Sequence, residues 1–254
     1  MEHICGINSV KEALNAGRRR VHAVYYIEGS KNPAVMAVVD AAEKKGIKIK
    51  EVSRQKIHDL TNVETNQGIA AEVEPFKYIS IEELLVAVKK AGKPPFIVIL
   101  DQINDPHNLG AIIRTAHLLG ADGVVIPKDN SASVTPTVSK AASGALEYLP
   151  IVKVTNLTYT INLLKDNNVW VVGAEGESSK NLYEYDFTTG TAIVLGGEGR
   201  GLRRLIKDSC DELLHIPMAG RIDSFNVSVA GAIFMSEVMR QRLCKNRADS
   251  SKKT

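Results

Sequence analysis

Three polar segments of the sequence hold the residue types best suited to chemistry, and the first two follow apolar runs of strand length. The first extends from Asp101 to Ala116 and contains Asn108 and Arg114. An asparagine at position 108 suits the N-cap of a helix. Arg114 suits a surface ion pair and equally a bidentate contact to an anionic substrate. Taken alone, this segment leaves a structural and a chemical interpretation open.

The second segment, from Leu195 to Leu202, places four glycines around a single carboxylate, Glu198. Glycines between a strand and the start of a helix favour a close approach of the backbone to a ligand. The dinucleotide motif G-x-G-x-x-G is absent from this segment, and Leu202 and Arg203 stand where a phosphate-binding loop requires Lys and then Ser or Thr. A carboxylate among glycines has little structural purpose except capping the following helix, so Glu198 is a candidate functional residue.

The third segment, from Ile216 to Ala230, combines polar residues with the start of a small-residue stretch. Ser224 and Asn226 each suit the N-cap of the last helix. The residues from Val227 onward are small and apolar, as in a helix packed tightly against another surface. Here too a capping role and a ligand-binding role both fit.

The elements that must position these segments alternate regularly from residue 96 onward. Buried-strand runs fall at 96–100, 124–126, 151–154, 169–172 and 192–195, and helical patterns at 108–119, near Pro136 and from about 226 to 242. Such alternation predicts a mainly parallel sheet covered on both faces. Ligands bind beyond the carboxyl ends of strands in sheets of this kind, and the three polar segments occupy such positions.

The first 75 or so residues predict a separate, smaller α/β unit. A helix ends at Gly17, and further helices are expected at 33–45 and 54–60 between strands at 21–27, 47–52 and 68–73. We therefore divide the chain into a small domain at 1–76, a linker and helix at 77–92, a larger domain at 93–245 and a basic, disordered tail at 246–254. The functions of the domains at 1–76 and 93–245 follow from the resemblance described below.

Composition restricts the class of protein. A hydrophobic fraction of 44% and a charged fraction of 24% are typical of a soluble globular protein, and no apolar run approaches the ~20 residues of a membrane span. The first residues lack a secretory-signal pattern, and Cys5, Cys210 and Cys244 form neither a disulfide framework nor a zinc spacing. We expect a cytoplasmic protein without metal or membrane partner. The net charge of +3, with basic clusters, is compatible with nucleic acid.

In their order, spacing and content, the three segments resemble the signature motifs of the SpoU (TrmH-like) family of RNA ribose 2′-O-methyltransferases. The resemblance covers 96–242. It extends to the N-terminal unit, where the segments 6–10 and 66–70 look like the small RNA-binding domain, similar to ribosomal protein L30e, of the branch that methylates guanosine in 23S rRNA. Asn66 departs from that pattern, in which histidine is expected before Gln67 and Gly68.

The resemblance implies an α/β fold whose parallel sheet carries a deep trefoil knot of the SPOUT type. Periodicity alone would not suggest this, because knots are nearly absent from proteins. It also implies S-adenosylmethionine as the methyl donor, held mainly by backbone groups, with the adenine among apolar residues. The implied cofactor-binding residues are Leu195, Gly196, Gly197, Gly199, Ile216, Pro217, Met218, Ser224 and Asn226.

The resemblance also implies the catalytic roles. It places Arg114 at the ribose hydroxyl, whose proton must be removed or polarised. Because arginine keeps its proton in proteins, we expect a contact to the hydroxyl and its phosphate, and a role in passing the proton onward stays open. Asn108 and Glu198 are expected to orient Arg114 and the ribose. Ser224 and Asn226 are expected to hold the cofactor and the last helix. The remaining candidates, His107, Cys210 and His215, are interpreted as loop, core or surface residues.

Family members are dimers, so a homodimer bound to RNA, with 23S rRNA as the favoured substrate, is the implied assembly. Three alternatives stay open. The same chemistry could act on another RNA, such as a thiostrepton-resistance-type rRNA site or tRNA. The chain could be a catalytically silent RNA-binding or ribosome-assembly factor, or a transferase acting on a small molecule.

Overall fold

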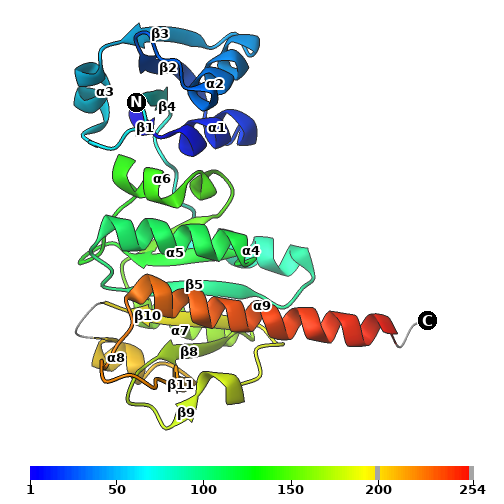
Figure 1. The fold of residues 1–254 in the computed structure, drawn as a ribbon. Coiled ribbons are helices and arrows are strands. Elements are labelled where there is room, and N and C mark those ends of the chain that lie inside the picture. Colours follow the sequence, from blue (N-terminus) through cyan, green and yellow to red (C-terminus); the bar gives the residue numbers. More distant parts are fainter. Residues whose placement is uncertain (198–200, 252–254) are drawn as a thin grey trace. The chain divides into compact units, whose positions relative to one another are not determined.

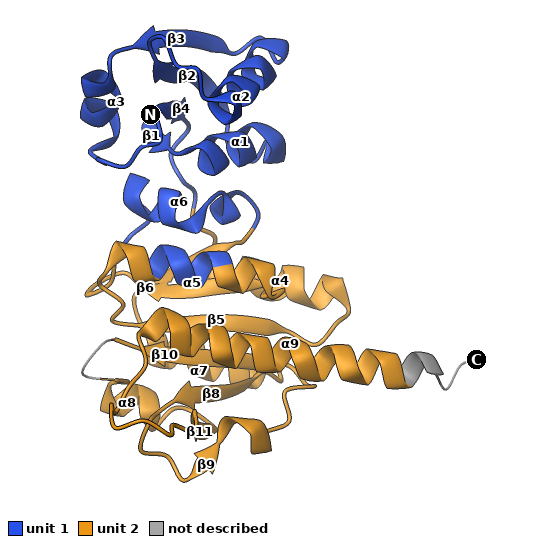
Figure 2. Ribbon diagram, in the orientation of Figure 1, with its two compact units in different colours: residues 1–77, 109–114, 133–148 blue, residues 78–108, 115–132, 149–254 orange. Residues whose placement is uncertain are grey.

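The computed structural model describes residues 1–197 and 201–251, and its contacts divide the chain into two compact units (Figures 1 and 2). Unit 1 comprises residues 1–77, 109–114 and 133–148, and unit 2 comprises the rest. The first predicted domain thus forms most of unit 1. Unit 1 also takes in two later segments, 109–114 and 133–148, which lie beyond the predicted N-terminal domain.

Unit 1 is built on a four-stranded sheet of order β1-β4-β2-β3, in which only β2 and β3 are parallel. Alternating side chains of each strand face opposite sides, so Val24 packs under α1 and α2 whereas Ala23 and Tyr25 pack under α3. Both faces of the sheet therefore carry apolar cores. The elements are β1 (Glu2–Cys5), α1 (Ile7–Ala16), β2 (Val21–Ile27), α2 (Pro33–Lys44), β3 (Lys48–Val52), α3 (Arg54–Thr61) and β4 (Ile69–Val73).

Residues 133–148 complete unit 1 by packing against α1. They form α6 (Pro136–Ala142) and the short 3-10 helix η1 (Ala145–Glu147). The Ser9 hydroxyl donates to the Ser139 carbonyl at 2.9 Å, and the Asn8 amide donates to the Ser143 hydroxyl at 3.1 Å. A Cβ added to Gly144 would lie 2.6 Å from Cβ of Glu12, so this contact requires glycine.

The two N-terminal motifs are therefore used, in large part, for packing inside unit 1. The Gln67 side chain accepts a hydrogen bond from the backbone of Ile7 at 2.9 Å, which satisfies a free amide at the start of α1. Asn66, where the resemblance expected histidine, is buried and bonds the backbone of Val63 and of Gly68. The position thus holds the turn before β4.

A buried ion pair lies at the same contact. The Arg19 guanidinium donates to both carboxylate oxygens of Glu147, its Nε to Oε2 at 3.2 Å. Both residues are almost fully buried, at 6% and 4% exposure. The Phe76 ring lies 5.6 Å from the guanidinium carbon, and the Glu2 carboxylate 3.7 Å from Nη1. Such a pair depends on both members, since either charge alone would be left buried.

Unit 2 contains a seven-stranded sheet of order β7-β6-β5-β10-β8-β11-β9, parallel throughout its described pairings. The predicted parallel sheet is confirmed, and the predicted strands at 151–154 and, in unit 1, 21–27 match the observed bounds. The strands are β5 (Phe96–Asp101), β6 (Gly123–Pro127), β7 (Ile151–Val154), β8 (Trp170–Ala174), β9 (Lys180–Asn181), β10 (Thr191–Gly196) and β11 (Glu212–His215).

Helices cover both faces of this sheet. One face packs against α4 (Ile81–Ala91), α7 (Leu157–Asp166) and α8 (Arg204–Lys207) in a single apolar core. On the other face α9 (Val227–Ser251) lies beside β10 (Figure 1), so closely that a Cβ on Gly231 would be 2.7 Å from Leu195. The remaining helices are α5 (Pro106–Leu118) and η2 (Leu182–Glu184).

Several elements differ from the sequence predictions. The short strands β1, β9 and β11 and the helices α7 and α8 were not predicted. The last helix, expected to end at Arg242, continues through Ser251 and so covers most of the segment predicted to be a disordered tail. Within the described ranges no helix, α9 included, is long and apolar enough to span a membrane.

Candidate functional site

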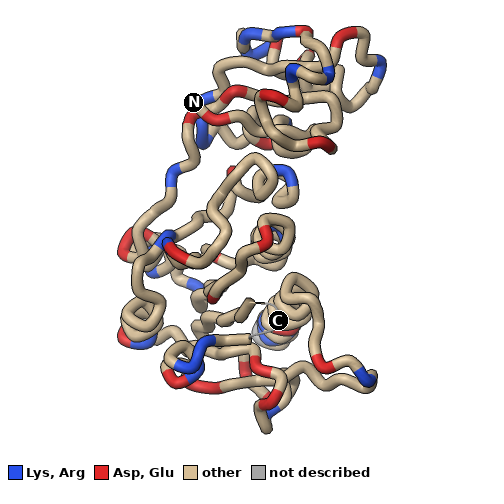
Figure 3. Tube along the Cα trace, turned by 90° about the vertical axis from the view of Figure 1, so that its left-hand side faces the viewer, with Lys and Arg blue, Asp and Glu red and all other residues tan. Residues whose placement is uncertain are grey.

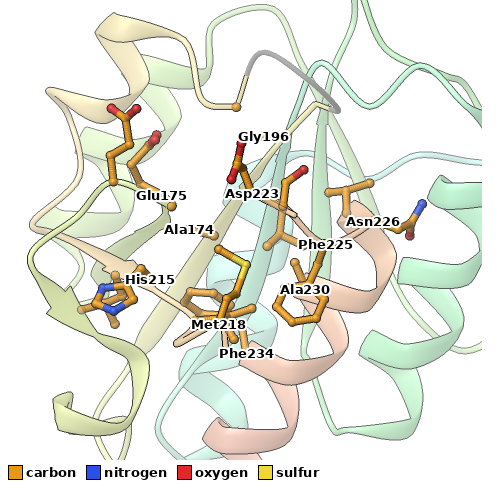
Figure 4. Close-up of a pocket in the computed structure, with 18 of the residues that line it drawn as sticks. Ala174, Glu175, Gly196, His215, Met218, Asp223, Phe225, Asn226, Ala230 and Phe234 are labelled. Atoms are coloured by element: carbon orange, nitrogen blue, oxygen red, sulfur yellow. The ribbon is translucent and has the colours of Figure 1, made fainter. Parts of the chain in front are cut away.

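A cavity of about 910 Å³ opens where β8, β10 and β11 end, beside the start of α9 (Figure 4). This is the carboxyl edge of the parallel sheet, where ligands bind in open α/β folds. Its size suits a nucleoside-sized ligand. Seven of the residues predicted for cofactor binding line it, namely Leu195, Gly196, Gly197, Ile216, Met218, Ser224 and Asn226.

The glycine loop after β10 is closed by its own backbone. The amide of Gly201 donates to the carbonyl of Gly197 at 3.1 Å, and the two residues form an antiparallel bridge. A Cβ on Gly196 would lie 2.3 Å from the carbonyl carbon of Gly201, and one on Gly197 would lie 2.6 Å from the carbonyl oxygen of Gln102. Both glycines are therefore required by close backbone packing. The predicted Glu198 and Gly199 lie outside the described residues.

A buried carboxylate fixes the far end of this loop. Asp101, the last residue of β5, is fully buried and accepts from the backbone amide of Arg203 at 3.0 Å and from its Nε at 2.8 Å. Asp101 is the first residue of the first polar segment, and no role was predicted for it from the sequence. Its position at a strand end next to the loop is the signal that could have identified it.

Gly196→Ala is expected to weaken binding of S-adenosylmethionine by about tenfold or more, because the added methyl group displaces the loop that forms one wall of the cavity. Isothermal titration calorimetry with the purified variant measures this. Gly220→Ala is the matched control, since nothing lies within 4 Å of a Cβ at Gly220. Wild-type affinity in Gly196→Ala would contradict the assignment of this loop to the cavity wall.

Asn108 does not cap a helix, contrary to the structural interpretation of its position. Helix α5 begins two residues earlier, at Pro106, and Asp105 is its N-cap, accepting from the amide of His107 at 2.9 Å. Asn108 therefore lies inside the first turn, and its side-chain oxygen accepts from Nδ2 of Asn226 at 3.1 Å. The link joins the first and third polar segments, as the chemical interpretation requires.

Asn226 also holds the start of α9. Its side-chain oxygen accepts from the backbone amide of Ser228 at 2.9 Å and from the Ser228 hydroxyl at 2.6 Å. The capping role and the pocket-lining role thus coexist in one residue. Ser224 lines the cavity and is exposed, while helix capping falls to Asn226.

Arg114 and Pro217, two further predicted residues, are not among the described residues that line the cavity. Arg114 is exposed on α5, six residues after Asn108 and so about 9 Å further along the helix. Its guanidinium is available to a ligand that approaches from solvent. His107 is exposed beside the N-cap.

The structure adds pocket residues that the sequence predictions missed. The segment after β8, including Glu175, lines one side of the cavity, as do Lys207 and Phe234. Since 169–172 was predicted as a strand, the rule that ligands bind beyond strand ends applied to this segment too. Burial raises the pKa of the Cys210 thiol to about 12, so this cysteine is not a nucleophile at neutral pH.

Comparisons with known proteins agree with this geometry. The sequence profile of the SpoU rRNA Methylase family matches residues 95–236, and that of RNA 2′-O ribose methyltransferase substrate binding matches residues 3–79. The chain belongs to the SpoU family. The catalytic profile covers the sheet and cavity of unit 2, and the substrate-binding profile covers the four-stranded sheet of unit 1.

Relatives of this SpoU chain are similar over nearly their whole length. The 23S rRNA (guanosine-2′-O-)-methyltransferase RlmB of Vibrio vulnificus is 40% identical over 95% of this chain and 98% of its own. The RlmB of Escherichia coli is 39% identical over 95% of this chain and 99% of its own. A Bacillus subtilis protein described as the putative TrmH family tRNA/rRNA methyltransferase YacO is 38% identical over 95% and 96%.

Solved structures share the fold of this SpoU chain. The methyltransferase AviRb from Streptomyces viridochromogenes, in complex with AdoMet, superimposes with a TM-score of 0.78 at 22% identity, covering 95% of this chain and 90% of its own. An AdoMet-bound rRNA methyltransferase from Sinorhizobium meliloti gives 0.75 at 25% identity, covering 94% and 87%. The order of sheets and helices is therefore that of an RNA 2′-O-ribose methyltransferase.

Proposed function

We propose that this chain transfers a methyl group from S-adenosylmethionine to the ribose 2′-hydroxyl of a guanosine in 23S rRNA. The observation that carries the proposal is the cavity at the ends of β8, β10 and β11. One of its lining residues, Asn226, donates a side-chain hydrogen bond to Asn108. Relatives near 40% identity over almost the whole chain are named for this reaction, which supports the choice of RNA and base.

The residues present fit the methyl donor. Apolar side chains of Leu195, Ile216 and Phe234 offer a surface for an adenine ring, and the glycine loop offers backbone groups. Two buried polar atoms at the cavity accept or donate no hydrogen bond among the described residues: Nδ1 of His215, and Oε2 of Glu175, which forms an ion pair with Lys207. A polar ligand would supply those partners.

Different side chains have different roles in the in-line displacement that transfers the methyl group. When bound, S-adenosylmethionine supplies an electrophilic methyl group on a sulfonium. The Asn108–Asn226 link holds α5 to the cavity wall and so fixes where α5 presents its side chains. Arg114 contacts the target hydroxyl and its phosphate, which positions the nucleophile. Glu198 orients Arg114 and the ribose, and Ser224 holds the donor.

We further propose that the catalytic domain contains the trefoil knot of the SPOUT fold, that the N-terminal domain is L30e-like, and that two copies form a homodimer in the cytoplasm. Exposed apolar side chains in the segment 222–229, which contributes several residues to the cavity lining, support the dimer, among them Ile222 at 80% exposure, Val229 at 46% and Phe225 at 41%. Removing such side chains from water is the main driving force of association.

RNA binding by this chain uses local clusters of basic residues, and not a large net positive charge. Basic and acidic positions are interspersed along the trace (Figure 3), in line with a net charge of only +3. Base recognition then depends on stacking and hydrogen bonds to an unpaired nucleotide, with phosphate contacts that weaken as salt rises.

The proposal is tested by incubating the protein with labelled S-adenosylmethionine and undermethylated rRNA, tRNA or assembled ribosomal subunits. Mapping by mass spectrometry should find one 2′-O-methylguanosine in 23S rRNA. Label in tRNA or at a different rRNA site would keep the chemistry and change the substrate. Binding of RNA with no label in any of the three would favour a silent assembly factor.

A further inference from the structure

We propose that Glu175 is a cofactor-recognition residue whose carboxylate accepts hydrogen bonds from the ribose diol of S-adenosylmethionine. The inference rests on the proposed function of the cavity. Glu175 follows β8 directly and lines the cavity, on the side opposite Asn226 in Figure 4. It lies outside the three polar segments of the sequence.

The backbone holds Glu175 firmly in place. Its amide donates to the carbonyl of Leu214 in β11 at 2.9 Å, and its carbonyl accepts from the amide of Ser178 at 3.2 Å. A Cβ built on Gly201 would lie 3.7 Å from Oε2 of Glu175, so the carboxylate sits against the end of the glycine loop. Two walls of the cavity therefore meet at this carboxylate.

The carboxylate is buried but has spare hydrogen-bonding capacity. Its side chain is 14% exposed, and Nζ of Lys207 lies 2.6 Å from Oε2. Beside this ion pair, Oε2 accepts no hydrogen bond among the described residues, so acceptor positions of the carboxylate stay open to a ligand. Of the three described carboxylates that line the cavity, Glu175 alone is not exposed, whereas Glu177 and Asp223 are. A buried acceptor in this state calls for a donor from a ligand.

The charge of Lys207 determines which hydrogen-bond donor of the ligand suits Glu175. S-adenosylmethionine offers two classes of hydrogen-bond donor, the neutral hydroxyls of its ribose and the cationic ammonium of its methionine part. An ammonium bound to Glu175 would lie close to the ammonium of Lys207, and like charges at that distance repel. Neutral hydroxyls meet no such repulsion, and an acidic residue at a strand end binds a ribose in this way in dinucleotide folds.

The test is calorimetric and needs no RNA. The ligands are S-adenosylhomocysteine, its 2′,3′-dideoxy analogue, and 5′-methylthioadenosine, which has the ribose but not the amino-acid part. Glu175→Ala should weaken the binding of S-adenosylhomocysteine and of 5′-methylthioadenosine equally, by about tenfold or more. It should leave the dideoxy analogue unchanged. Glu175→Gln, which keeps the shape of the side chain, should lower the affinity for the same two ligands by a smaller factor.

Glu212→Ala is the matched control, since it removes the carboxylate of an exposed pair with Lys180 away from the cavity. A loss for S-adenosylhomocysteine but not for 5′-methylthioadenosine would move the contact to the ammonium and overturn the proposal. Wild-type affinities in both Glu175 variants would overturn it as well. If the wild-type chain bound none of the ligands, the cavity itself would be misassigned, and the proposed function would fall with it.

Discussion

Arg114→Ala is expected to lower the rate of methyl transfer by about a thousandfold while leaving the affinity for S-adenosylmethionine close to that of the wild type. The two effects separate because Arg114 is exposed on α5 and is not among the described residues lining the cavity. In the proposed role its guanidinium contacts the RNA, where a fork of donors matches phosphate and hydroxyl oxygens.

Single-turnover transfer to undermethylated 23S rRNA, together with calorimetry for the donor, measures both quantities. Arg114→Lys should recover only part of the rate, since a point charge cannot reproduce the planar fork. Lys90→Ala, which removes an exposed cation near the end of α4, serves as the control. Wild-type turnover in Arg114→Ala would make Arg114 a structural residue.

Glu147→Ala is expected to lower the free energy of unfolding by about 3–5 kcal/mol. Removing this carboxylate leaves the Arg19 guanidinium, 6% exposed, without its bidentate partner. The distant carboxylate of Glu2, 3.7 Å from Nη1 and 42% exposed, compensates for little of this loss. Urea denaturation followed by circular dichroism gives the difference.

The double variant Arg19→Met/Glu147→Leu separates loss of the pair from burial of an unpaired charge. Apolar replacements of a buried pair are often neutral, so the double variant should be more stable than Glu147→Ala. Glu212→Ala, which breaks an exposed pair, should change stability by less than about 1 kcal/mol. A double variant as unstable as the single one would show that the pair contributes through its fixed geometry.

The alternating fold could be predicted because its strands are buried and continuous in sequence. The runs at 21–27 and 151–154 are bounded by polar or turn residues, and their observed limits are the predicted ones. The strands β9 and β11 include charged or polar side chains and so carry too little apolar pattern, and they form because a neighbouring strand offers free backbone groups.

The start of α5 could have been predicted better. Asp105 followed by Pro106 is a strong start signal, since Asp caps a helix and Pro favours its first position. Asn108 drew the prediction instead because it resembled a cap. Its real partner, Asn226, lies 118 residues away, and no local pattern reports such a contact.

Only part of the cavity lining could be predicted, because some of its residues have a local signal in the sequence and others do not. Glycines that follow a strand end are visible in the sequence, and Gly196, Gly197 and Ile216, which were expected to share a site, line the same cavity. Glu175 and Lys207 were missed because a single acidic or basic residue has no distinctive spacing in the sequence, and because α8, which carries Lys207, was not predicted. Only their 2.6 Å separation inside the cavity marks them.

The packing of residues 133–148 against α1 bears on how proteins of this architecture can be recombined. Unit 1 is discontinuous along the chain, and side chains of Ser9, Glu12 and Arg19 are matched to Ser139, Gly144 and Glu147. Grafting a foreign N-terminal domain at residue 77 would therefore transfer only half of an interface. A chimera that also carries its donor's counterpart of 133–148 would keep the interface whole, so exchangeable modules here are defined by contact and not by linear position.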